Sequence, residues 1–385
     1  MILLLLLWFF KSIGMIGSVR SITGITGGIY NIGSMSFAIN ITGCPRNPNI
    51  VSLTSNDIAT YNRSLSDPLL KGSVAWFFNV CTFNNASYQK NHRMFPQTVS
   101  MPCAGKTPLS KMTYNVSNTC GFMELYAYQE FAAVAYSEFT GGKNLTSTPQ
   151  VIVNTPLNCQ FYGAGNQDCK NKRQCYIWLR ADRLHLTQTF IHEYGHTLNL
   201  QHSANIANIP RPGMSFWAYG DSSCIMGSAS SSQICYNAPH ARKLGYAKPI
   251  VDLVASALPL NVTKTYTLPF FTTSPINHMT LKTATAMIYI SIRSNSASLN
   301  GADHTINADY DKVLSIHMLK STDAKPSIIA LVKPGKSYNL YSTLKMDDDY
   351  GNEESPFLGM RENVTISFIS FWGQKGALVS INRTG

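Results

Sequence analysis

The chain has 385 residues, which exceeds the ~250–300 residues at which a single hydrophobic core usually stops growing, so we expect two domains. Hydrophobic residues make up 44% of the sequence, and this excludes a disordered or collagen-like chain. Charged residues make up only 13%, against a usual ~25%, and the net charge of +11 is scattered along the chain. We therefore predict no nucleic-acid partner.

The first 20 residues are predicted to be a signal peptide. Residues 2–10 form an apolar run, and the small residues Ser12, Gly14 and Gly17 follow it. The run is too short for a comfortable membrane span, so we expect no stable span. A signal anchor remains the alternative, because no basic residue precedes the run. The sequence therefore predicts a secreted, extracellular protein.

Sequons and cysteines agree with an extracellular location. Eight Asn-X-Ser/Thr sequons are spread over both halves of the chain, and glycans on them would solubilise a surface that is poor in charge. They begin at Asn40, Asn62, Asn85, Asn115, Asn144, Asn261, Asn363 and Asn382. Nine cysteines all lie between Cys44 and Cys235, so disulfides are expected there and at least one thiol is left over. The cysteine-free remainder indicates a domain boundary near residue 249.

The first part of the chain predicts a mixture of strands and helices. Short strands are predicted over 35–41, 151–153 and 175–179. Helical spacing predicts one helix over 125–139, ended by Gly141 and Gly142, and a second that opens at Asp182. Between the last two strands, Gly163 and Gly165 predict a turn.

After about Pro249 the apolar pattern changes to period two. Alternating segments at 288–292, 314–318 and 364–368 are separated by clusters of Gly, Pro, Asn and Asp. They predict an all-β, sandwich-like domain over 250–385 that positions substrate without supplying chemistry. The acidic run from Asp347 to Glu354 does not fit the EF-hand spacing and is expected to be a solvated loop.

The second predicted helix carries His192, Glu193 and His196 in an H-E-x-x-H pattern. An i, i+4 pair places both imidazoles on one face, where they can bind a single zinc ion. Glu193 lies beside the pair, where its carboxylate can take a proton from an activated water.

His202 can join the same metal only if the helix breaks before it. Six further helical residues would carry it ~9 Å along the axis from His196. Asn199 lies in the gap, and Asn is the commonest residue other than Gly in the left-handed conformation that ends helices. We therefore predict a left-handed turn at Asn199 that returns His202 to the metal.

Residues 192–202 resemble the metzincin signature H-E-x-x-H-x-x-G-x-x-H, with Asn199 in place of Gly. Residues 219–227 (YGDSSCIMG) resemble a Met-turn, and the runs 237–240 (NAPH) and 244–246 (LGY) follow. This ordered set is similar to the gametolysin branch of secreted metallopeptidases, which cleave cell-wall and matrix glycoproteins. The resemblance covers about residues 33–246 well and the C-terminal domain loosely. It implies an α/β (α+β) metzincin-like catalytic domain over 33–249.

The resemblance also implies roles for single residues. His192, His196 and His202 would be zinc ligands, Glu193 the general base and Met226 the apolar residue beneath the metal. The implied function is a zinc metalloendopeptidase that cleaves extracellular-matrix or cell-wall glycoproteins. Two alternatives remain open: a non-enzymatic matrix or glycan-binding protein, and a zinc hydrolase that acts on other bonds.

Further candidates near the motif are given weaker roles. His185 and His240 are expected to be structural. Tyr236 or Tyr246 is a candidate for stabilising the oxyanion. Few residues separate the signal from the first strand, so no propeptide with a zinc-capping cysteine is expected.

Overall fold

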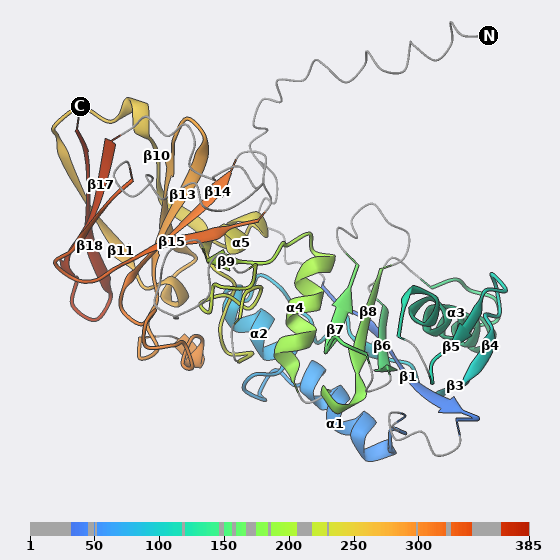
Figure 1. Cartoon of the computed structure of the whole chain (residues 1–385). Coiled ribbons are helices and arrows are strands. Elements are labelled where there is room, and N and C mark those ends of the chain that lie inside the picture. The colour runs from blue at the N-terminus through green and yellow to red at the C-terminus, as the bar shows by residue number, and fades with distance from the viewer. Residues whose placement is uncertain are drawn as a thin grey trace, which may run out of the picture.

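The computed structural model describes residues 32–44, 50, 52–117, 120–145, 150–155, 159–166, 175–183, 186–205, 218–228, 231–297, 299–320, 325–340 and 363–384. The predicted signal peptide, His185 and the acidic run from Asp347 to Glu354 lie outside these residues. In the described part, a mixed α/β region and a β-rich region lie side by side (Figure 1).

A six-stranded sheet forms the centre of the α/β region. Its strands are β1 (Met35–Thr42), β2 (Arg93–Met94), β3 (Val99–Pro102), β6 (Gln150–Thr155), β7 (Gly163–Gly165) and β8 (Tyr176–Arg180). The order is β2-β1-β6-β8-β7, and β3 also pairs with β1. All pairs are parallel except that β7, at one edge, runs antiparallel to β8. A small separate sheet pairs β4 (Ala104–Lys106) with β5 (Thr113–Asn115).

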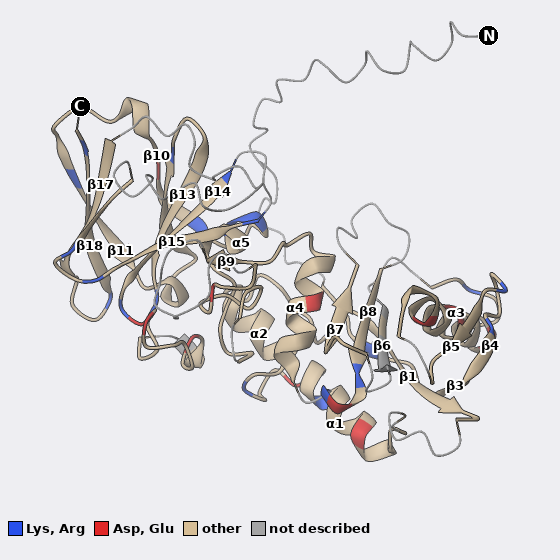
Figure 2. Ribbon diagram, viewed as in Figure 1, with Lys and Arg blue, Asp and Glu red and all other residues tan. Residues whose placement is uncertain are grey.

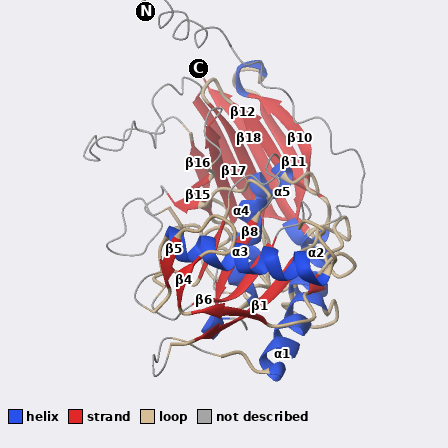
Figure 3. Ribbon diagram, turned by 90° about the vertical axis from the view of Figure 1, so that its right-hand side faces the viewer, coloured by secondary structure: helices blue, strands red, loops and turns tan. Residues whose placement is uncertain are grey.

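Helices cover both faces of this sheet (Figure 3). They are α1 (Ser55–Ser66), α2 (Val74–Cys81), α3 (Phe122–Phe139) and α4 (Thr187–Thr197). In β8, Trp178 packs in a cluster with Tyr128 of α3, whereas the neighbouring Ile177 packs in a different cluster with Ile191 of α4. Because successive side chains of a strand point to opposite faces, the apolar residues of β8 pack against α3 on one face and against α4 on the other.

The β-rich region contains two further sheets. Its elements begin with the short helix α5 (Ala238–Lys243) and continue with β10 (Lys248–Val254), β11 (Thr263–Pro269), β12 (Ile276–Lys282), β13 (Ala286–Ile292), β14 (Leu314–Lys320), β15 (Ser327–Val332), β16 (Ser337–Asn339), β17 (Asn363–Phe371) and β18 (Gly376–Thr384). One sheet has the order β10-β12-β13-β14-β15-β9 and the other β11-β18-β17-β16. Ile288, Ile316 and Val364 belong to the hydrophobic core that these strands share.

Most predicted elements are confirmed, and two are wrong. The strands at 35–41, 151–153, 175–179, 288–292, 314–318 and 364–368 and the helix at 125–139 are present. Gly163 and Gly165 do not form a turn but the edge strand β7. Asp182 does not open a helix, because it lies in a 3-10 turn over Ala181–Arg183 and pairs with Arg180 at 2.7 Å. Helices α1 and α2 were not predicted.

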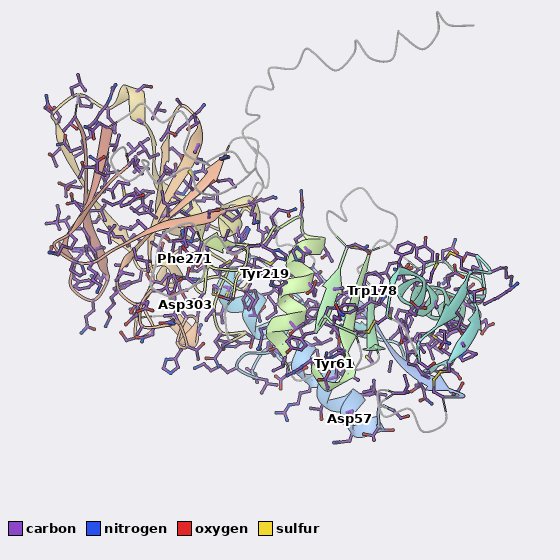
Figure 4. All side chains as sticks on the ribbon, in the orientation of Figure 1. Asp57, Tyr61, Trp178, Tyr219, Phe271 and Asp303 are labelled. Carbon is purple, nitrogen blue, oxygen red and sulfur yellow. A yellow bond between two sulfur atoms is a disulfide. The ribbon has the colours of Figure 1, made fainter. Side chains whose placement is uncertain are left out.

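Contacts between the two regions are extensive. Strand β9 (Ala204–Asn205) lies in the α/β part of the chain but pairs with β15, so it extends a sheet of the β-rich region. Phe271 and Tyr289 from the β-rich region belong to the hydrophobic cluster that includes Ile191 of α4. Phe271 and Asp303 lie where the two regions meet (Figure 4). The domain boundary at 249/250 stays a prediction.

Disulfides occur in the α/β region, as predicted. Three join Cys44 to Cys103, Cys81 to Cys235 and Cys120 to Cys159, and Cys175 is also disulfide-bonded. Among the described cysteines, Cys224 is free, and it is buried. Structural disulfides persist mainly in oxidising compartments.

Within the described ranges, no helix has the length and apolar character needed to cross a bilayer.

Candidate active site

Helix α4 holds the first part of the site. Its buried face carries Phe190, Ile191 and Tyr194, which pack against β8 and α2. The hydroxyl of Thr187 donates to the Gly72 carbonyl at 2.7 Å and ties the start of the helix to the turn before α2. The hydroxyl of Tyr194 donates to the Gly33 carbonyl at 2.9 Å. These contacts fix the helix that carries the H-E-x-x-H pattern.

The three histidines of the pattern converge on one point. One nitrogen from each of His192, His196 and His202 lies within 4.8 Å of the others. The Nε2 atoms of His196 and His202 are 3.0 Å apart. Two ligands of a tetrahedral zinc ion, each bound at ~2.0–2.1 Å, lie roughly 3.3 Å apart, so this spacing suits a shared metal.

Backbone carbonyls orient two of the imidazoles. His192 Nδ1 donates to the Ile225 carbonyl at 2.8 Å, and His196 Nδ1 donates to the Leu200 carbonyl at 2.9 Å. A neutral ring that donates from Nδ1 keeps a lone pair on Nε2, which is the form that binds a metal. Burial lowers the pKa of His192 to about 4 and that of His202 to about 3, so both rings are neutral at pH 7.

A left-handed residue after α4 returns the chain to the site. Asn199 has φ +64°, which confirms the conformation predicted for it. Its carbonyl accepts a hydrogen bond from Lys243 Nζ of α5, and the Leu200 amide donates to the Gly195 carbonyl at 2.9 Å. This turn allows His202 to approach His196.

The effect of replacing Asn199 on metal binding is expected to depend on whether the new residue can adopt a positive φ, and not on the size of its side chain. Asn199→Gly should keep zinc affinity close to wild type, because Gly adopts a positive φ freely. Asn199→Val should weaken zinc binding, because a β-branched residue is strained there by about 1–2 kcal/mol or more. Zinc affinity measured by competition with a chelator tests this. Equal affinities for the two variants would show that the turn does not depend on this residue.

Glu193 belongs to α4 and packs against the edge strand β7. The residue is only 9% exposed, and burial raises the pKa of its carboxyl to about 8; a metal cation held by the adjacent histidines would lower this pKa and favour the ionised form that a base needs. A methyl group on Gly163 would lie 2.9 Å from Glu193 Cγ, and one on Gly165 would lie 2.8 Å from the Glu193 carbonyl oxygen. Only a strand without side chains at these two positions can pack so closely against the helix. This packing explains why glycine occupies both positions, although the sequence alone favours a turn there.

Met226 lies directly beneath α4. A methyl group on Gly195 would lie 2.4 Å from Met226 Sδ and 3.2 Å from the hydroxyl oxygen of Tyr236. Gly195 therefore allows the buried Met226 to approach the helix one residue before His196. The contact gives a packing reason for a glycine inside a helix.

Tyr219 borders the three convergent histidines, and sequence reasoning assigned it no role. Its ring centroid lies 3.9 Å from that of His202 and 5.8 Å from that of His192. The side chain is 36% exposed, and Figure 4 shows it beside α4. An aromatic ring at this place restricts the orientation of both imidazoles.

The other described candidates, His240, Tyr236 and Tyr246, are core residues. His240 is buried in α5, where its Nδ1 lies 3.4 Å from Cys224 Sγ, in agreement with a structural role. The hydroxyl of Tyr236 donates to the Ile191 carbonyl at 3.1 Å inside the core, and Tyr246 is also buried. Neither tyrosine is among the ring partners of the three histidines, so the structure gives no support to an oxyanion role for them.

Three convergent imidazoles with a buried carboxylate next to one of them are typical of the metal centres of hydrolases. The sequence profile of gametolysin peptidase M11 matches residues 35–330, which is more than half of the chain. The chain therefore belongs to the gametolysin peptidase M11 family and is a metallopeptidase. A comparison with curated proteins gives no match. The matched range extends through β10–β14 into β15, so it includes part of the β-rich region.

Proposed function

We propose that this protein is a secreted, zinc-dependent endopeptidase that cleaves glycoproteins of an extracellular matrix or cell wall. The observation that carries the proposal is the convergence of His192, His196 and His202 within 4.8 Å, with Glu193 next to the first of them. Membership of a metallopeptidase family favours peptide bonds over other bonds, and it does not favour a non-enzymatic binding protein.

The three histidines suit zinc as their metal. Neutral imidazole nitrogen is a preferred zinc ligand, and three protein ligands leave one position open for catalysis. When bound, zinc would polarise the scissile carbonyl and lower the pKa of a water molecule towards neutrality. The carbonyl groups of Ile225 and Leu200 hold the rings of His192 and His196 in the orientation that ligation needs.

Glu193 is proposed to move the proton. Its carboxylate takes a proton from the attacking water and passes it to the nitrogen of the leaving amine. The packing of β7 around Glu193 excludes water from one side of the carboxylate and restricts its rotamers. Met226 supports the helix from below and makes no proposed contact with substrate.

Extracellular location is supported by the disulfides and the sequons. Disulfides close three pairs of cysteines in the described residues, and Asn85, Asn144 and Asn261 are exposed sequon positions. Charged residues are sparse along the ribbon in Figure 2, so attached glycans would supply much of the polar surface.

Removal of the metal is expected to abolish peptide hydrolysis, and zinc should restore it. His196→Ala should lose both zinc and activity, because two remaining imidazoles bind zinc poorly. His304→Ala is the matched control, because His304 is exposed and far along the chain from the motif. Zinc content by mass spectrometry and hydrolysis of a labelled peptide test this. Full activity in excess chelator, or in metal-free His196→Ala, would refute the proposed function.

A further inference from the structure

A single buried carboxylate joins the segments around the metal site. Asp221 is fully buried in the segment before Met226. Its Oδ2 accepts hydrogen bonds from Ser203 Oγ at 2.8 Å, Asn237 Nδ2 at 3.0 Å and His317 Nε2 at 3.0 Å. Its Oδ1 accepts from the amide and hydroxyl of Ser223. Burial alone would raise the pKa of Asp221, but His317 and these hydrogen bonds lower it below its usual value.

Ser203 connects this carboxylate to the third histidine. It directly follows His202 and is fully buried. Its amide donates to the Met226 carbonyl at 2.9 Å, and its carbonyl accepts from the Asp221 amide at 3.2 Å. Its hydroxyl donates to Asp221 and accepts from Asn237 Nδ2 at 2.8 Å. Every polar group of Ser203 is therefore bonded, and this fixes the backbone from which His202 extends.

His317 reaches the site from the β-rich region. It lies on β14, 96 residues after Asp221, and is 1% exposed. The register between β14 and β15 shifts between Ile316 and His317, and such irregularities redirect side chains. The neighbouring strand β15 pairs with β9, which begins at Ala204. The segment after His202 thus contacts this sheet through both the backbone and Asp221.

We propose that Asp221 and His317 are positioning residues that hold His202 in place through Ser203, so that the β-rich region completes the metal site. The inference deepens the proposed function and rests on it, because it assigns an outer support to the third proposed zinc ligand. Partners that orient metal ligands from outside commonly affect metal affinity by about 10–100-fold.

The test compares full-length variants for zinc affinity, the visible spectrum of the cobalt-substituted protein and the melting temperature of the metal-free protein. His317→Leu removes the hydrogen bond to Asp221, and Ser203→Ala removes the side-chain link between Asp221 and the residue after His202 with little loss of volume. Both should weaken zinc binding by about 10–100-fold and change the cobalt spectrum. His317→Gln keeps an N–H donor and should restore affinity towards wild type.

A buried ion pair elsewhere in the core provides a matched control. Arg293 and Asp303 lie 2.8 Å apart, are both almost fully buried, and bond to the backbone of Cys235 but not to Ser203. Asp303→Asn should therefore lower the melting temperature without changing zinc affinity or the cobalt spectrum.

The results distinguish a failure of the positioning role from a failure of the proposed function. Zinc affinity unchanged in both Ser203→Ala and His317→Leu would overturn the positioning role, as would an equal loss of affinity in Asp303→Asn. If His317→Leu does not fold, Ser203→Ala alone decides, because it leaves Asp221 and His317 paired. His192→Ala reports separately on the proposed function: if it binds zinc as tightly as wild type, the three histidines are not the metal site.

Discussion

Replacing Glu193 by glutamine is expected to abolish peptide hydrolysis while zinc stays bound. The two side chains have nearly the same shape, but an amide cannot accept the proton of the attacking water. General-base catalysis typically contributes about 10²–10⁴-fold, so kcat should fall by at least that factor. Zinc content should remain near one ion per chain, because Glu193 is not one of the convergent nitrogen ligands.

Glu130→Gln provides the control for loss of a buried carboxylate. Glu130 is 6% exposed and accepts hydrogen bonds from the Leu109 and Ser110 amides at 2.7 and 2.9 Å. Its replacement should reduce stability and leave kcat close to wild type. A Glu193→Gln protein with kcat within tenfold of wild type would rule out Glu193 as the base.

The convergence of the three histidines could be predicted from sequence because it depends on local geometry. The i, i+4 spacing fixes His192 and His196 on one helix face. The third histidine needed one further assumption, a left-handed residue between 196 and 202, and Asn199 satisfies it with φ +64°. The convergence of the three histidines could therefore be predicted from short-range steric rules alone.

Strand β7 could not be predicted, because the packing that requires its glycines involves a residue of another element, Glu193 of α4. Gly163 and Gly165 favour a turn when only local conformational freedom is considered. In the structure, their missing side chains leave room for Glu193. Glycine is favoured both in turns and where a strand packs closely against a helix, and local sequence rules cannot distinguish these two cases.

The support of His202 from β14 could not be predicted either. Asp221 belongs to the segment that resembles a Met-turn, but nothing in the sequence relates it to His317, 96 residues away. The strand pattern at 314–318 predicted β14 and left its neighbours undetermined. Contacts between distant strands follow from tertiary pairing, which period-two patterns do not encode.

Removing residues 250–385 is expected to leave a protein without a stable metal site. The sequence alone predicts a domain that positions substrate without supplying chemistry, so its loss would spare the hydrolysis of small peptides provided that the catalytic part still folds. The contacts favour loss of function, because Phe271 and Tyr289 pack in the same core cluster as Ile191 of α4. The truncation also removes β15 from β9 and His317 from Asp221, two contacts of the segment that follows His202. The family match, which continues to residue 330, agrees with one cooperative unit.

The truncated chain, residues 33–249, should be insoluble, or soluble with low zinc content and no hydrolysis of a small peptide. Co-expression of residues 250–385 as a separate chain should restore zinc binding, because the contacts that cross the boundary at the site are noncovalent. The exposed apolar surface and the unpaired Asp221 both favour this reassociation, since a buried carboxylate without its partner typically costs about 3–5 kcal/mol. A soluble, zinc-loaded 33–249 fragment that hydrolyses a small peptide at the wild-type rate would show that the β-rich region is dispensable for the chemistry.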